Sequence, residues 1–421
     1  MESTQSPSAK VGGSARTTRC LESTVPTRRQ PVSKSFFDRH RAVDTDAHVT
    51  EPPDLWTSRL PKKWGDAVPR LERIEGRDVW VMGGKNAGMG PGMVTAAGFD
   101  GTFPESRMTF DECPVESWDP KARLSLLDAD GIHAQLIYPN AGGFGSGAFI
   151  ALEQPELMLA CVQAYNDFLI EWCSADPNRL IPVMASPFWD VDAWVGEIER
   201  CAKLGHKAVL ACNQPKTWGQ PALFEPHWDR VYAAAQDHDL SISFHIGGGS
   251  FEDMAAEFSA SGGPKANFAR VSSTLFADNS KQIADVIFGG VCHRFPKLDF
   301  VSVESGVGWI GSALEAMDWQ WRNGGVSKEH PEYDLLPTEY FERQIYGCFW
   351  FEENALRQAL ERFPNNIMWE TDYPHPTSMS PGPATPALPP RDYIDQVLAG
   401  LPEDVVHNVL EGTPARIYNL N

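Results

Sequence analysis

The sequence predicts an α/β protein in which eight parallel strands, each followed by helix, close into a (β/α)8 barrel. From residue 41 to the end, short apolar runs alternate with helix-like segments. Most of the runs are nearly continuous apolar stretches, as strands buried on both faces should be. An open, doubly wound sheet is the alternative, but no GxGxxG or GxxxxGKS/T motif opens any of the helices.

Eight apolar runs are the predicted strands, which is the number that a closed parallel barrel needs. They are residues 42–49, 133–139, 179–188, 206–213, 240–247, 298–305, 344–351 and 366–375. Helix-like segments separate them. The clearest are residues 155–175, 191–205, 226–239 and 353–363.

Three connections are too long for simple turns: residues 52–120 after the first strand, 248–278 after the fifth, and 376–390. Long loops inside a compact domain are usually functional or mobile. All three follow a strand, so we expect them at the C-terminal mouth of the barrel, where such enzymes build their sites. The glycine-rich residues 83–93 lack the lysine and hydroxyl residue of a phosphate loop, so we expect a flexible flap.

The domain organisation is expected to be a tail followed by one barrel domain over residues 41–421. Residues 1–40 are basic and rich in Ser, Thr and Pro, so they cannot bury enough apolar surface to offset their ordering entropy. We expect a disordered tail, either a plain extension or an organelle transit peptide. With 42% apolar residues, the remaining chain can bury a large core.

The net charge of -20 argues against a nucleic-acid or anionic membrane partner, because both attract basic surfaces. No apolar run approaches the roughly 18 residues of a membrane span. The eight cysteines form no CxxC pair, and several lie in apolar segments, so we expect reduced core thiols in a cytoplasmic enzyme. They are Cys20, Cys113, Cys161, Cys173, Cys201, Cys212, Cys292 and Cys348.

Metal-binding side chains fall at the ends of three predicted strands. Asp46 and His48 point the same way, because side chains alternate along a strand. His245 ends the strand SISFH, and Asp372 ends the last strand, in ETDYPH. Nitrogen and oxygen ligands from separate strand ends, with room for water, are typical of a catalytic zinc site or a similar ion.

Each of these residues alone also has a structural interpretation. Asp46 could cap a turn, His245 could be a satisfied core histidine, and Asp372 could begin a β-turn before Pro374. Their common position at strand ends on one face favours the metal site.

Further candidates lie near the same ends. Glu304, which ends the strand VSVE, is a candidate general acid or base, a possible metal contact, or a buried partner for an arginine. His375 is a candidate proton donor or a turn histidine. Glu51 is expected to orient His48. Arginines that could bind a substrate carboxylate or form surface ion pairs are Arg270, Arg322 and Arg343. Histidines expected to be structural are His133, His206, His227, His238 and His293.

From about residue 42 onward, the chain resembles the amidohydrolase-related enzymes of the aminocarboxymuconate-semialdehyde decarboxylase type. The matching segments are DAHVTEPPDLW (46–56), DADGIHAQLIYP (128–139), SFHIG (243–247), HRFPKLDFVSVESGVGWI (293–310), WETDYPHPTS (369–378) and NVLEGTPARIYNL (408–420). The resemblance implies a metal-dependent (β/α)8 barrel, often a homodimer, that decarboxylates or hydrolyses small carboxylic acids. It also implies that the metal ligands are Asp46, His48, His245 and Asp372.

The chain differs from this family at two positions. The better-known decarboxylases carry HxH or ExH in the first strand, where this chain has Asp46 and His48. After FPKL they commonly place a catalytic histidine, where this chain has Glu304.

These observations predict an enzyme with one divalent ion, zinc or else manganese, that decarboxylates a small aromatic or unsaturated carboxylic acid. Glu304, His375 or Asp372 would deliver the proton that replaces carbon dioxide. The alternative is a hydrolase, in which a metal-bound hydroxide attacks an amide, ester or lactone and Asp372 takes the proton. A barrel that only binds a partner is a third possibility, which the intact ligand set disfavours.

Overall fold

Eight parallel strands form one sheet in the order β1-β5-β6-β7-β8-β9-β10-β11 in the computed structural model, which describes residues 34–249 and 256–421. The strands are β1 (Val43–His48), β5 (Ala134–Tyr138), β6 (Leu180–Met184), β7 (Ala208–Ala211), β8 (Ser241–His245), β9 (Phe300–Val303), β10 (Ile345–Phe349) and β11 (Ile367–Trp369). Every residue of these strands is buried. Each strand lies inside its predicted range, so all eight predictions are confirmed.

The sheet closes on itself where the first and last strands meet. Ala47 forms a parallel bridge with Tyr373, just beyond β11. The N–H of Asp372 donates to the carbonyl of Asp46 at 2.9 Å, and the N–H of His48 donates to the carbonyl of Tyr373 at 2.6 Å. This closure confirms the barrel and excludes the open sheet. It also lies at the C-terminal ends of the strands, beside three of the predicted ligands.

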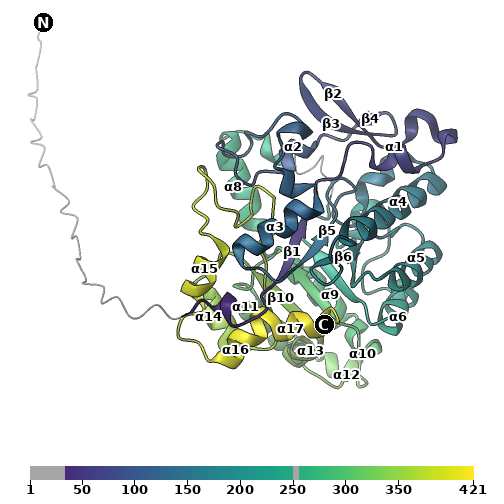
Figure 1. The fold of residues 1–421 in the computed structure, drawn as a ribbon. Helices are drawn as coiled ribbons and strands as arrows, with labels where there is room; N and C mark the ends of the chain where they lie inside the picture. Colours follow the sequence, from purple (N-terminus) through teal and green to yellow (C-terminus); the bar gives the residue numbers. More distant parts are fainter. Residues whose placement is uncertain (1–33, 250–255) are drawn as a thin grey trace, which may run out of the picture. The chain divides into compact units, whose positions relative to one another are not determined.

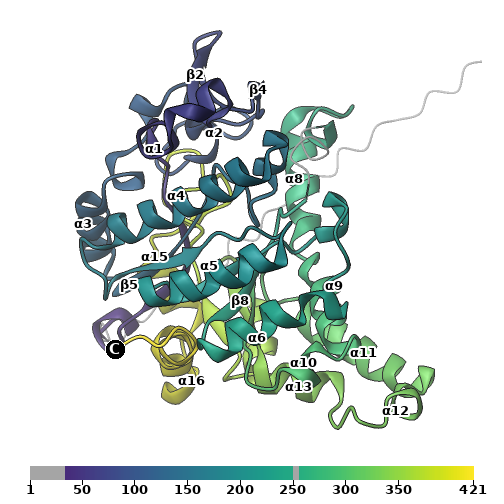
Figure 2. The same cartoon turned by 90° about the vertical axis from the view of Figure 1, so that its right-hand side faces the viewer.

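Helices follow the strands and cover the outside of the barrel (Figures 1 and 2). They include α3 (Pro120–Asp130), α4 (Pro155–Cys173), α5 (Val191–Leu204), α6 (Asp229–Asp237), α9 (Asn279–Phe288), α11 (Ile310–Gly324), α13 (Pro337–Gln344), α14 (Asn354–Arg362), α15 (Pro390–Val397), α16 (Glu403–His407) and α17 (Thr413–Ile417). The sequence sets their ends. In α5, for example, the Asp190 side chain accepts the N–H of Ala193 at 3.0 Å, and Gly205 (φ 110°) ends the helix.

The long insertion after β1 contains an antiparallel sheet of β2 (Arg70–Ile74), β3 (Arg77–Met82) and β4 (Lys85–Asn86), followed by α2 (Pro91–Val94). In both views it lies at the same end of the barrel as α8 (Pro264–Leu275), opposite α12 (Val326–Glu329) and α13. The segment 83–93, predicted as a flexible flap, contains β4 and the start of α2. Gly83 and Gly84, both with positive φ, make the turn between β3 and β4.

Part of the expected tail belongs to the barrel unit, which begins at Ser35. Residues Phe36–Asp38 form a short 3-10 helix, and the Ser35 hydroxyl and the Phe36 N–H both donate to Asp395 Oδ1 of α15, at 3.1 and 2.9 Å. Phe37 is buried, with its ring 5.3 Å from that of Trp369. The predicted boundary at residue 40 is thus wrong for residues 35–40. Residues 1–33, on which the rest of that prediction depends, lie outside the described residues.

The core also accounts for the cysteines. All seven described cysteines are buried free thiols, as predicted, and Cys20 lies outside the described residues. Among the described helices, none combines the length and the hydropathy that crossing a membrane requires.

Candidate metal centre and the pocket above it

The four predicted ligands lie together at the C-terminal mouth of the barrel, and all are at most 1% exposed. Asp46 and His48 come from β1 and point to the same side, as the alternation of strand side chains predicts. A break in the β1–β5 register between Asp44 and Ala47 lies next to them, a common feature beside active sites. His245 ends β8, and Asp372 lies three residues past β11.

Hydrogen bonds from Nδ1 set the orientation of the His48 and His245 rings. His48 Nδ1 donates to the Pro139 carbonyl at 3.2 Å, and His245 Nδ1 donates to its neighbour Ile246 at 2.8 Å. Each Nε2 is therefore left with a lone pair. These two Nε2 atoms are 3.3 Å apart, and they lie 3.3 and 3.5 Å from the two carboxylate oxygens of Asp46.

Both oxygens of Asp46 are buried without a hydrogen bond from any described residue. Burial alone would raise the pKa of Asp46, but the adjacent His48 and His245 rings hold it below its ordinary value. Lone pairs on two nitrogens and a carboxylate thus converge on one buried point. A divalent cation satisfies such a donor set, and these residues fit one.

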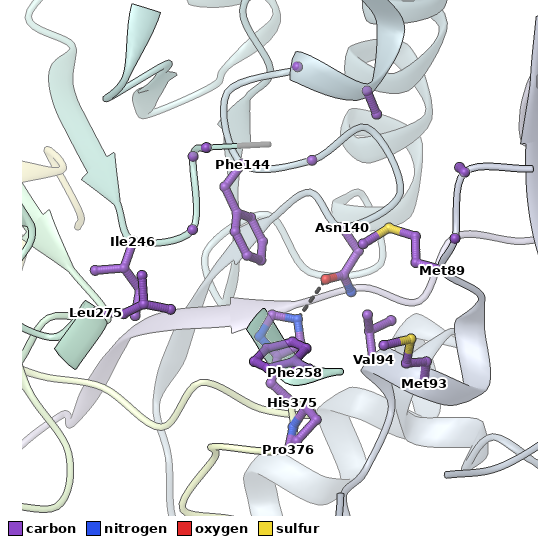
Figure 3. A pocket seen from close by; sticks show the side chains of 18 of the residues that line it. Met89, Met93, Val94, Asn140, Phe144, Ile246, Phe258, Leu275, His375 and Pro376 are labelled. Carbon is purple, nitrogen blue, oxygen red and sulfur yellow. Dashed lines mark hydrogen bonds between the residues drawn. The ribbon is translucent and has the colours of Figure 1, made fainter. Parts of the chain in front are cut away.

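Asp372 and His375 complete this group. Asp372 Oδ1 lies 3.5 Å from His48 Nε2 and 2.5 Å from His375 Nδ1. The His375 ring stacks on His48 at 3.8 Å, and its Nε2 lies 2.6 Å from Asn140 Oδ1 (Figure 3). Because the amide nitrogen of Asn140 donates to the Val49 carbonyl, its oxygen is free to accept from His375. Burial lowers the pKa of His375 to about 3, so the ring is neutral at neutral pH.

Glu304 lies at the edge of this group and faces the pocket. Its Oε2 is 3.4 Å from His245 Nδ1, and its Oε1 is 3.0 Å from the hydroxyl of Thr377, which also lies 2.6 Å from Asp372 Oδ2. Burial, and after it the nearby Asp372, raises the pKa of Glu304 well above its ordinary value. No described arginine forms an ion pair with Glu304, so the interpretation as an arginine partner is wrong.

Glu304 and Asp372 share an unusual backbone conformation. Their φ angles are +52° and +58°, in the left-handed region that residues other than glycine seldom adopt. Holding a side chain there costs on the order of 1 kcal/mol, and such residues cluster at active sites. Both carboxyl groups are turned toward the same centre by this conformation.

Within the described residues, Glu51 forms no hydrogen bond with His48, so any effect it has on the orientation of His48 is indirect. Its Oε1 accepts the N–H groups of Asn140 and Ala141 at 2.8 and 2.9 Å. It therefore fixes the segment that carries the Pro139 carbonyl and the Asn140 side chain. Through these two groups it acts on both His48 and His375.

A cavity of about 760 Å³ opens above the centre (Figure 3). Asn140, Glu304, His375 and Thr377 line its polar floor, and apolar side chains form most of its walls. The cavity is lined by residues from the insertions after β1 and β8, and by the start of the connection 376–390. These three loops therefore lie at the mouth, as predicted. Phe144 stacks on the His245 ring at 3.9 Å and lies over the centre.

The other predicted candidates lie away from this centre. Arg270 pairs with Glu257 at 2.7 Å, Arg322 is 3.9 Å from Asp318, and Arg343 donates to the Cys292 carbonyl. None of the three lines the cavity, which favours the alternative that they are ordinary structural or surface arginines. The five histidines expected to be structural do not line it either.

Three residues of the site were not predicted: Asn140, Phe144 and Thr377. Each carried a usable signal. Asn140 directly follows the second predicted strand, and Thr377 lies inside the segment ETDYPHPTS that contains Asp372. Phe144 is the one large residue in the run AGGFGSG, which suggests a side chain held by a loop of small residues.

Comparisons with known proteins agree with this geometry. Residues 43–420 match the family described as amidohydrolase. A 2-amino-3-carboxymuconate-6-semialdehyde decarboxylase of Dictyostelium discoideum is 24% identical over 338 residues, which are 77% of this chain and 81% of the relative. The match confirms the resemblance noted in the sequence.

Solved structures share the fold. An amidohydrolase of Mycobacterium avium subsp. paratuberculosis K-10 superposes with a TM-score of 0.69 at 20% identity, over 91% of this chain and 98% of the other. A dihydroxybenzoic acid decarboxylase of Polaromonas sp. JS666, with bound manganese and the inhibitor 2-nitroresorcinol, superposes with a TM-score of 0.57 at 16% identity, over 91% and 98%.

Proposed function

Because the chain belongs to the amidohydrolase family, we propose that it is a metal-dependent carboxy-lyase that removes carbon dioxide from a small aromatic or unsaturated carboxylic acid. The observation that carries this proposal is the pair of Nε2 lone pairs, on His48 and His245, that face the buried Asp46 carboxylate at the floor of an apolar cavity. The decarboxylases among the relatives support the choice of reaction.

One divalent ion is proposed to bind Asp46, His48, His245 and Asp372. Zinc fits this nitrogen and oxygen donor set, and manganese is the other choice, since it is bound in the similar dihydroxybenzoic acid decarboxylase. When bound, the ion supplies positive charge that attracts the oxygens of the acid.

The proton that replaces carbon dioxide comes from the protein's own residues. Glu304 is proposed as the proton donor, because its carboxyl group lines the cavity beside the centre. The proton passes to the substrate carbon that carries the carboxylate. The bond between this carbon and the carboxylate carbon breaks, and carbon dioxide leaves. Asp372 remains the other candidate for this step. Since the Nε2–H of His375 is donated to Asn140, this ring has no free proton to give, and we assign His375 to the polar floor beside Asp372.

Apolar side chains surround the place of this step. Phe144 covers the His245 ring, and the cavity walls carry few groups that hold water. A substrate carboxylate that enters loses its hydration shell and meets the fixed charges of the floor instead.

Two further properties are part of this proposal. A cytoplasmic location fits the seven buried free thiols, which survive in a reducing compartment. A homodimer is proposed as the assembled state, and the exposed Trp319 of α11 (65%) is an apolar surface residue that an interface would cover. Light scattering of the purified protein would give the mass.

The experiment is metal analysis combined with product detection. The protein purified without chelator should hold about one equivalent of divalent metal. It should release carbon dioxide from 2,6-dihydroxybenzoate or a related hydroxybenzoate. His245→Ala should lose both metal and turnover, whereas His133→Asn, which changes a histidine before β5 and away from the cavity, should keep both.

Two results would contradict the proposal. Full activity in chelator, without bound metal, would remove the ion from the reaction. Cleavage of an ester, amide or lactone, without carbon dioxide from any acid tested, would make the protein a hydrolase.

A further inference from the structure

The cavity is large for a single-ring acid. Its volume of about 760 Å³ lies in the upper part of the range of roughly 300 to 1,000 Å³ found for sites that enclose drug-sized ligands. Its polar side chains gather on the floor, as Asn140, Glu304, His375 and Thr377, and the other described polar side chains of the lining are Lys85, Asn86 and Ser272. A small acid held on this floor would leave most of the apolar wall in contact with water.

The two long insertions build one wall together. Phe103, from the insertion after β1, packs on Phe268 of α8 with ring centroids 4.3 Å apart, and Phe258 lies 5.8 and 5.7 Å from these two rings. An ion pair between Glu105 and Lys265, at 2.9 Å, joins the same two segments. This aromatic wall is thus formed by contacts within the protein itself.

The remaining walls are apolar as well (Figure 3). Met89 and Met93 lie on one side, and their flexible thioethers adapt to irregular apolar shapes. Trp218 lines the cavity beside Gly147, where an added Cβ would come within 2.5 Å of the indole. A glycine is therefore required at position 147 for the indole to lie where it does.

Charged groups are few above the floor. Lys85 is the one cation among the described lining residues, and it is exposed beside Glu153 at 3.4 Å. Arg270 of α8 is directed instead to Glu257. A second anionic group on the ligand, against these apolar walls, would lose its hydration without a partner.

From these observations we infer that the substrate is an aromatic monocarboxylate that carries a second ring, or an apolar chain of similar size. The acid end would lie on the polar floor, and the apolar extension would lie against Phe103, Phe258 and Phe268. This inference rests on the proposed function, because it places the carboxylate at the metal centre.

The test compares salicylate with 4-phenylsalicylate and 5-phenylsalicylate, using the full-length protein as purified and calorimetric titration for binding. For the better phenyl isomer, the Kd should be at least tenfold lower than for salicylate, since a buried phenyl group removes a large apolar area from water. A carboxylate added to the second ring of that isomer should abolish the gain.

A variant pair locates the effect. Phe268→Ala should reduce the ratio of the two Kd values at least threefold, because it removes a central ring of the aromatic wall. Ser273→Ala changes an exposed position on the same helix and should leave the ratio unchanged. Melting temperatures of both variants show whether the helix remains folded.

The outcomes separate this inference from the proposed reaction. Equal Kd values for salicylate and both phenyl acids, or no binding of any of them, would overturn the substrate class. Carbon dioxide released from salicylate alone would keep the reaction and refute the class. Tighter binding of a phenyl acid without carbon dioxide release would keep the class and refute the reaction.

Discussion

Glu304→Gln is the substitution that tests the reacting group most directly. Glutamine has nearly the same shape, and its carbonyl oxygen can still accept from the Thr377 hydroxyl, which lies 3.0 Å from Glu304 Oε1. The change removes the carboxyl proton and leaves the apolar walls intact. Metal content should therefore remain at about one equivalent, as a single-ion site requires.

The size of the effect follows from this contact. One neutral hydrogen bond is worth about 1 kcal/mol, so the free energy of unfolding should change by no more than about that amount. Loss of a proton donor should instead lower turnover by roughly two to four orders of magnitude. This loss corresponds to about 3 to 5 kcal/mol in the barrier.

Glu352→Gln is the matched control. Glu352 is also a buried glutamate just beyond a barrel strand, but its Oε1 accepts the N–H groups of Val307 and Gly308, at 2.6 and 3.3 Å. It does not line the cavity. Its replacement should lower the melting temperature while the folded fraction keeps its turnover.

Metal content, melting temperature and turnover of both variants are the assay. Normal turnover with normal metal content in Glu304→Gln would refute the assignment of the proton donor. Loss of the ion would instead make Glu304 a ligand. A lower melting temperature with unchanged turnover of the folded fraction would make it a structural residue.

Three more predictions follow from the described contacts. Asp46→Asn should lower metal affinity at least tenfold, measured by competition with a chelator of known affinity, and unchanged affinity would remove Asp46 from the ligand set. Deleting residues 1–40, or the change Phe37→Ala, should lower the free energy of unfolding by about 3 kcal/mol in chemical denaturation, because a buried ring is lost; no change would mean that residues 35–40 do not stabilise the barrel. Burial lowers the pKa of His206 from 6.5 to about 4, so its contribution to stability is fully present above pH 6.5 and is lost as the pH falls toward 4, by up to about 3 kcal/mol. In His206→Leu, the free energy of unfolding from denaturation curves should fall less between pH 6.5 and 4. The same fall as in the parent protein would contradict its assignment to His206.

The barrel could be predicted because each of its strands is buried on both faces. Such strands leave short, nearly continuous apolar runs in the sequence, and their ends mark one edge of the sheet. Asp46, His48, His245 and Asp372 were found for the same reason: a polar side chain that ends an apolar run has to face the mouth.

Other features of the structure depend on contacts between residues that are far apart in the sequence. A local sequence pattern does not reveal such contacts. The position of Glu51 just after the first strand does not show that its oxygen accepts from Asn140 and Ala141. Phe37 follows a basic, polar stretch, and only the complete barrel supplies the surface that buries it. The walls of the cavity come from two insertions whose contact, through Phe103 and Phe268, has no periodicity to predict it.

The closure of the barrel has a consequence for how the protein is made. Asp44 accepts both the N–H and the hydroxyl of Thr371, at 2.8 and 2.6 Å, across 327 positions of the chain. Main-chain hydrogen bonds of Asp46 and His48 join the same two ends. Contacts of this span are among the slowest to form. The proposed ion site is therefore incomplete in a growing polypeptide until the last strand has emerged. An ion bound by Asp46, His48 and Asp372 would then join the first strand to the last.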